Sequence, residues 1–102
     1  MLFIYKRLKK DFKFIESYGF RYICHLKSNI APGVYYKKGE ESLGVGFDYV
    51  EGEFYCLYNR NGSAHYCEPL KKAGHNIQSY NRQVAKAKET IETFLKELGH
   101  HI

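Results

Sequence analysis

LGVGFDYVEGEFYCLYNRNGSAHYC, residues 43–67, contains two turn signals that define how three strands pair. Asn61-Gly62 is the strongest short signal for a β-hairpin, and Glu51-Gly52 is a plausible second turn. If each dipeptide occupies the two central positions of its turn, the register of both hairpins follows. The expected cross-strand pairs are Tyr58 with His65, Cys56 with Cys67, Phe47 with Cys56, and Tyr49 with Phe54.

Side chains alternate between the two faces of a strand, so this register also sorts them. The first face is apolar and is expected to lie in the core; it carries Leu43, Val45, Phe47, Tyr49, Phe54, Cys56 and Tyr58. The second face mixes glycine, tyrosine and polar residues and need not be covered; it carries Gly44, Gly46, Asp48, Tyr55, Leu57, Ala64 and Tyr66. A one-residue slip at either turn would exchange the faces of every residue that follows.

Both ends of the chain have helical periodicity. A helix is expected over residues 4–18, where Gly19 stands at the position of a C-terminal cap. A second helix is expected over residues 77–98, with Gly99 as its stop. The apolar stripes are Ile4, Leu8, Phe12, Ile15 and Tyr18 in the first helix, and Ile77, Tyr80, Val84, Ala87, Ile91, Phe94, Leu95 and Leu98 in the second.

Two further strands precede residue 43. Residues 34–38 form a short strand that turns through Gly39-Glu40, so that Tyr36 lies beside Leu43 and Val34 beside Val45. Residues 20–26 alternate and are expected to form the first strand of the sheet. This alternation places Phe20, Tyr22, Cys24 and Leu26 on one side, and Arg21, Ile23 and His25 on the other.

These elements predict one α+β domain over residues 1–102, with an N-terminal helix, an antiparallel meander of about five strands and a C-terminal helix. Both helices are expected to pack side by side on the apolar sheet face and to leave the opposite face open. We interpret that open face as the partner-binding surface. Its predicted residues are Arg21, Ile23, His25, Tyr35, Lys37, Asp48, Tyr55, Leu57 and Tyr66.

Composition bounds the class of protein. The 102 residues are 44% hydrophobic and 17% aromatic, which suits one domain with one core. The formal charge of +5 favours acidic partners such as nucleic acid, an anionic protein surface or anionic lipid. The apolar opening at residues 1–5 is too short for a signal peptide or a membrane span, and the three cysteines lack C-x-x-C spacing. We therefore expect a cytoplasmic chain that does not enter a membrane.

Few residue patterns point to catalysis or metal binding. Cys56, His65, Cys67 and His75 lack the spacing of structural zinc sites, and the first three fall on the predicted core face. Asp48 with His25 is the one acid–base pairing that the open face allows. His100 and His101 follow the last helix and are expected to be a solvated tail. Because no nucleophile elbow, phosphate loop or metal signature is present, we predict no enzyme, no cofactor and no metal.

Nucleic-acid binding is one interpretation of the open face. Its tyrosines, together with Lys37 and Arg21, could stack bases and contact phosphates of RNA or of a single strand. The lysines of the first helix could equally serve only to solvate its outer face. Residues 43–49 also lack the basic residue that opens the usual RNA-binding strand signature.

A protein partner is the other interpretation. FKFIESYGF at residues 12–20, followed by LGVGFDY at residues 43–49, resembles the opening of small bacterial immunity proteins of toxin and contact-dependent inhibition systems. In those chains an amphipathic helix ends in a Tyr-Gly-Phe-like turn, and an alternating strand ends in Asp-Tyr. The resemblance covers about the first half of the chain and implies an antitoxin-type binder that occludes a cognate toxin domain. The basic charge departs from the acidic composition usual among immunity proteins that block nucleases.

We therefore predict a non-enzymatic binding protein, an immunity or antitoxin-type inhibitor of a bacterial toxin domain. Nucleic-acid binding is the first alternative, and a phage anti-defence protein, which would share nearly all of these features, is the second. A tyrosine-rich, partly apolar surface suits a protein partner because Tyr and Arg anchor many interfaces.

Overall fold

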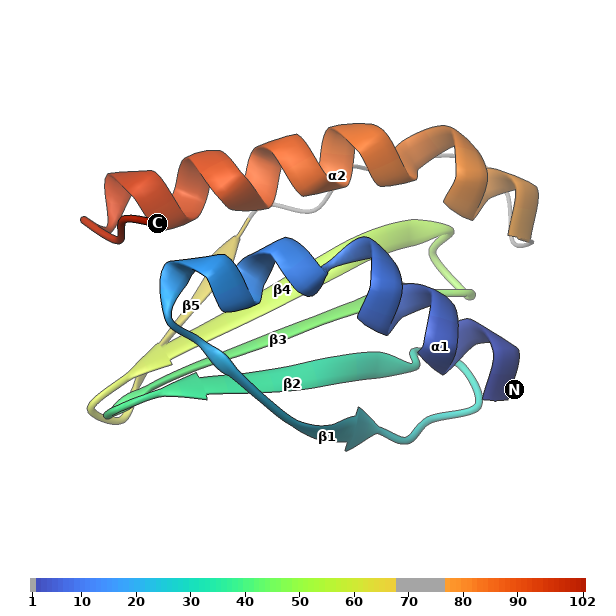
Figure 1. Cartoon of the computed structure of the whole chain (residues 1–102). Helices are drawn as coiled ribbons and strands as arrows, with labels where there is room; N and C mark the ends of the chain where they lie inside the picture. The colour runs from blue at the N-terminus through green and yellow to red at the C-terminus, as the bar shows by residue number, and fades with distance from the viewer. Residues whose placement is uncertain (1, 68–76) are drawn as a thin grey trace.

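The structure is a computed structural model that describes residues 2–67 and 77–102 (Figure 1). It has the predicted α+β architecture, with an N-terminal helix, an antiparallel meander sheet and a C-terminal helix packed on the sheet. The five strands follow chain order, β1-β2-β3-β4-β5. The elements are α1 Leu2–Asp11, the 3-10 helix η1 Lys13–Tyr18, β1 Arg21–Leu26, β2 Gly33–Lys38, β3 Glu41–Asp48, β4 Glu53–Arg60, β5 Ser63–Cys67 and α2 Ile77–Glu97.

The helices lie on one side of the sheet, α1 and η1 beside α2 (Figure 1). Their apolar stripes and one face of β2, β3 and β4 together make one core. No helix in the described part of the chain is long and apolar enough to cross a bilayer. The sheet contributes Val34, Tyr36, Leu43, Val45, Phe47, Phe54, Cys56 and Tyr58 to this core, and each of them is at most 2% exposed.

The N-terminal helix changes its pitch part-way along. The α-helix ends at Asp11, and residues 13–18 continue as a 3-10 helix. Phe12, Ile15 and Tyr18 recur every three residues, and three residues make one 3-10 turn, so the tighter helix keeps all three side chains in the core. Gly19 then ends the helix as predicted, with φ +94° and its N–H donating to the Glu16 carbonyl at 3.0 Å.

The β3–β4 connection is longer than the predicted two-residue turn. Phe47 faces Phe54, and Asp48 faces Glu53, so the predicted pairs of Phe47 with Cys56 and of Tyr49 with Phe54 are wrong. The Asp48 carboxylate stabilises the longer turn by accepting the N–H groups of Val50 and Glu51, at 2.9 and 3.1 Å. The register shift is two residues, which leaves every side chain on its predicted face because the strand period is also two.

The other predicted pairs are confirmed. β2 and β3 place Val34 opposite Val45 and Tyr36 opposite Leu43. The β4–β5 hairpin places Tyr58 opposite His65 and Cys56 opposite Cys67.

The first strand contains a register shift that overturns part of its predicted alternation. Tyr22 faces Tyr36, but Cys24 faces Tyr35, so Ile23 is an extra residue in β1. After Ile23 the faces exchange: Cys24 and Leu26 lie on the open face. His25 lies on the helix-covered face, opposite Val34 and stacked on the Tyr5 ring of α1 at 4.5 Å. The prediction that His25 belongs to the open face is therefore wrong.

Candidate partner-binding surface

The candidate site is the sheet face on which no helix of the described residues packs, and we call it the open sheet face (Figure 1). Cross-strand partners share a face, so the register arranges its residues in rows across the strands. A polar row of Arg21, Lys37, Ser42 and Asn59 lies at one end, followed by Cys24, Tyr35, Gly44 and Leu57, then Leu26, Gly33, Gly46 and Tyr55, and finally Asp48 and Glu53.

Most of the predicted surface residues lie on or beside this face. Leu57 and Ile23 are large apolar side chains within strands and are 39% and 41% exposed. Arg21 and Lys37 are exposed, whereas Tyr35, Asp48 and Tyr55 are half-buried. The backbone of Tyr66 pairs with that of Leu57, but the Tyr66 side chain lies outside the described residues.

Tyr55 is held flat against the sheet by two glycines. A Cβ on Gly46 would lie 2.5 Å from Tyr55 Cζ and 2.4 Å from the Pro32 carbonyl oxygen, and a Cβ on Gly33 would lie 2.5 Å from Tyr55 Oη. The Tyr55 hydroxyl donates to the Ala31 carbonyl at 2.8 Å, and burial raises the pKa of Tyr55 to about 12. Because Gly33 and Gly46 have no side chains, the Tyr55 ring can lie against the backbone at these positions. Tyr55 is therefore fixed in place before any partner binds.

Gly46→Ala is expected to destabilise the fold by about 2 kcal/mol, because an alanine methyl at this position would push against both Tyr55 and the Pro32 backbone. Gly44→Ala is the matched control on the same strand. Its Cβ would meet only Leu26 Cδ1, the end of a flexible side chain, at 3.2 Å. Urea unfolding of both variants measures the difference. Equal stabilities would contradict the close packing of Tyr55 against Gly46.

Like charges face one another at two opposite corners of the open sheet face. Arg21 lies directly opposite Lys37, and Asp48 lies directly opposite Glu53. Like charges in such cross-strand pairs destabilise a sheet. Within residues 2–67 and 77–102, none of these four side chains takes part in an ion pair. The open sheet face thus has an apolar middle between a cationic corner and an acidic corner, and neither corner has an ion pair among the described residues.

Several exposed lysines of the described residues lie in the helical layer, away from the open sheet face. Lys6, Lys10 and Lys13 are exposed there. Two other cations contact aromatic rings, Arg7 over Tyr80 at 4.6 Å and Lys9 over Tyr22 at 4.2 Å. The lysine-rich helix and the tyrosines of the open sheet face therefore lie on different sides of the molecule.

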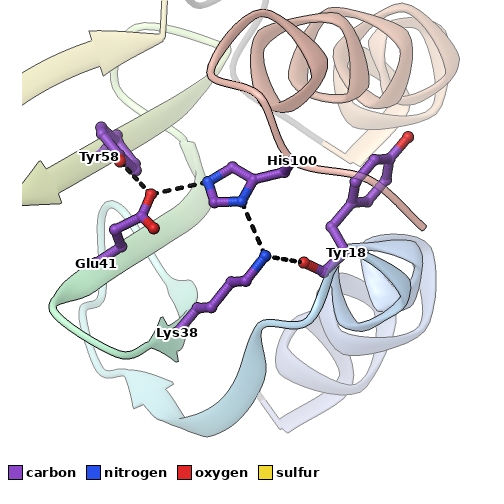
Figure 2. Close-up of polar contacts among 5 residues, drawn as sticks. All are labelled: Tyr18, Lys38, Glu41, Tyr58 and His100. Carbon is purple, nitrogen blue, oxygen red and sulfur yellow. Dashed lines mark hydrogen bonds and ion pairs between the residues drawn. The ribbon is translucent and has the colours of Figure 1, made fainter.

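A second set of polar residues, which we call the His100 cluster, closes the end of α2 against the sheet (Figure 2). His100 is only 8% exposed, so the prediction of a solvated tail at this residue is wrong. Its Nε2 lies 2.8 Å from Glu41 Oε1, and its Nδ1 lies 2.9 Å from Lys38 Nζ. The Tyr58 hydroxyl donates to the same Glu41 oxygen, and Lys38 Nζ donates to the Tyr18 carbonyl at 2.8 Å.

These contacts define the hydrogen-bonding roles in the His100 cluster. An ammonium group only donates, so Nδ1 of His100 accepts from Lys38 and Nε2–H donates to Glu41. Burial raises the pKa of Tyr58 to about 12, and its hydrogen bond to Glu41 adds to that effect, which keeps the phenol protonated as a donor. Because both ring nitrogens of His100 are engaged, the imidazole has no free nitrogen to act as a base. The His100 cluster is a structural contact between α2 and the sheet.

A signal for the burial of His100 was present in the sequence. Gly99 adopts φ +93°, its N–H donates to Lys96, and the His100 N–H donates back to the Leu95 carbonyl at 3.1 Å. This is the Schellman arrangement, in which the residue after the glycine folds back toward the last turn of the helix. Since Leu95 lies on the buried stripe, His100 is carried toward the core.

The other candidate chemical sites are not assembled in the described residues. The Asp48 and His25 pairing is wrong, because the two side chains lie on opposite faces of the sheet. No three His, Cys, Asp or Glu side chains in the described part of the chain are grouped as metal ligands would be. Cys56 is buried, while the side chains of His65 and Cys67, and all of His75, lie outside the described residues.

Comparisons with protein-family models, curated proteins and solved structures find no match to this chain. The resemblance to immunity proteins therefore stays a prediction.

Proposed function

We propose that the chain is a non-enzymatic protein-binding module, an inhibitor of immunity or antitoxin type, that occludes a cognate toxin domain with its open sheet face. The observation that carries this proposal is a sheet face that no helix of the described residues covers, with Leu57 exposed near its middle, Ile23 exposed on its edge strand, and a pre-positioned tyrosine, Tyr55. Fixing an aromatic side chain before binding reduces the entropy lost in the complex.

The distribution of charge favours a protein partner over nucleic acid on this face. A base-stacking surface needs cations beside its aromatic rings to contact phosphates. Here the open sheet face carries Asp48 and Glu53 as well as Arg21 and Lys37, while the exposed lysines of α1 lie in the helical layer. A surface with cations at one corner and carboxylates at another matches a protein surface of mixed charge.

Leu57→Asp is expected to weaken toxin binding at least thirtyfold, because truncating or charging a central anchor costs about 2 kcal/mol or more. Leu57 lies opposite Gly44 near the middle of the open sheet face. The test first reads the gene immediately upstream. If that gene encodes a large secreted protein with a variable C-terminal domain, the chain is co-produced with that domain, and growth and affinity are measured; any other upstream gene counts against the proposal. Phe3→Asp, at an exposed apolar residue of the helical layer, is the matched control and should still protect.

The outcome separates the two candidate functions. Toxin binding through the open sheet face should persist at moderate salt and be lost in Leu57→Asp alone. The alternative result is binding that falls steeply with salt, that is lost in the Lys9→Glu/Lys10→Glu chain and that persists in Leu57→Asp. That result would place the binding surface on α1 and identify a polyanion as the partner. Protection by Leu57→Asp at the level of the unaltered chain would exclude the open sheet face as the inhibitory surface.

A further inference from the structure

We propose that the open sheet face also binds a second copy of this chain and forms a two-fold symmetric dimer. This proposal does not rest on the toxin-binding function. Three observations support it: no helix of the described residues packs on the face, Leu57 is exposed at its middle and Ile23 on its edge strand, and its two like-charge pairs have opposite signs at opposite corners (Figure 1).

The two charged corners are complementary to each other. Arg21 and Lys37 lie on β1 and β2 at one end of the strands, whereas Asp48 and Glu53 lie on β3 and β4 at the other end. Each pair is unfavourable within the isolated chain because like charges face each other across two strands. An opposite pair brought by a second molecule would relieve both.

Two-fold symmetry satisfies both corners at once. In a symmetric dimer the same patch is used on both subunits, so the patch must be self-complementary. A two-fold axis in the interface, perpendicular to the line that joins the two corners, places each cationic pair on the acidic pair of the other copy.

The apolar middle supplies the contact between the charged corners. Leu57, Tyr35, Cys24 and Leu26 lie in the central rows and are exposed or half-buried in the single chain. Tyr55 lies against Gly46 and Leu26 against Gly44, so these two side chains, not bare backbone, meet the second sheet at the centre of the face. Apolar residues inside a rim of compensated charge are the usual anatomy of a protein interface.

The second copy and a toxin domain would use the same face and therefore exclude each other. Dimerisation is measured on the purified chain alone, so its failure says nothing about toxin binding. If the Leu57→Asp chain still protects cells against the toxin, that result likewise says nothing about whether the unaltered chain dimerises.

The test reverses the sign of one charge at a time, at either corner. Lys37→Glu and Glu53→Lys should each weaken the dimer by roughly a hundredfold, about tenfold at each of two symmetric contacts. Neither should lower the stability of the single chain, because each replaces a like-charge cross-strand pair by an opposite one. Sedimentation equilibrium measures the dimer and thermal unfolding of the monomer measures the fold; Lys10→Glu in the helical layer is the control.

Mixing the two variants gives the decisive measurement. In an equimolar mixture the reversed charges meet at one contact and the native charges at the other, so the mixed dimer should form at the affinity of the unaltered chain. The double variant Lys37→Glu/Glu53→Lys should also dimerise. The proposal is overturned if the unaltered chain stays monomeric at the highest soluble concentration, if both single variants dimerise normally, or if the mixture stays monomeric.

Discussion

Tyr80→Ala is expected to lower the free energy of unfolding by about 4 kcal/mol, the cost typical of deleting a large buried aromatic side chain. Tyr80 is fully buried at the start of α2. Its ring packs on Phe54 and Phe47, with ring centroids 4.8 and 5.5 Å away. Because a domain of this size has a total stability of about 5–15 kcal/mol, the loss would be a large fraction of it.

Tyr80 also joins the two helices. Its hydroxyl donates to Asp11 Oδ2 at 2.7 Å, and the Arg7 guanidinium lies 4.6 Å above its ring. Burial raises the pKa of Tyr80 well above the ordinary value of 10.0, and the hydrogen bond to Asp11 raises it further. The folded chain therefore holds this phenol protonated, as a donor between α1 and α2.

Tyr80→Phe separates packing from hydrogen bonding. It keeps the ring and leaves the Asp11 carboxylate without its donor, so a loss of about 1.5 kcal/mol is expected. Denaturant unfolding of both variants gives the two values. A Tyr80→Ala chain no less stable than Tyr80→Phe would contradict the placement of this ring in the core.

His100→Leu is expected to cost about 3 kcal/mol, because it leaves the half-buried Glu41 carboxylate and Lys38 ammonium without a shared partner. His101→Leu, at the exposed neighbouring residue, is the matched control and should change little. Thermal unfolding compares the two. Equal stabilities would mean that the His100 cluster contributes nothing to the fold.

Acid should remove part of the same stabilisation. Burial raises the pKa of the Glu41 carboxyl, but the hydrogen bonds from Tyr58 and His100 outweigh burial and bring it below 4.5. A group with a lowered folded-state pKa stabilises the fold above its unfolded value and loses that contribution as the pH falls through the folded value. The stability difference between the unaltered chain and Glu41→Gln should therefore shrink below pH 4.5. A difference that is constant with pH would contradict the ionised Glu41 of the His100 cluster.

The faces of β2, β3 and β4 could be predicted because they depend only on alternation and on even register shifts. The β3–β4 turn is two residues longer than expected, yet Phe47 and Tyr55 still lie on their predicted faces. The face of His25 could not be predicted, because one extra residue at Ile23 reverses the alternation. Nothing in residues 20–26 marks that extra residue; the contact of His25 with Tyr5 forms only when α1 lies on the sheet.

The open sheet face could be predicted from the sequence, but the pairing of its charges across the strands could not. Arg21, Lys37 and Asp48 were predicted on this face, but Glu53 was missed because the expected tight turn sets Asp48 opposite Tyr55 rather than opposite Glu53. Only the observed register sets Asp48 against Glu53 and Arg21 against Lys37.

By itself, the sequence determined the order of the elements, the apolar side of each helix and of the central strands, and the positive-φ stops at Gly19 and Gly99. These features arise from interactions over a few residues, which a pattern can encode. Tertiary structure alone decided where His25 points, how His100 meets Lys38 and Glu41, and which charges face each other. Those contacts join residues from distant parts of the chain, so their geometry exists only after the helices have packed on the sheet.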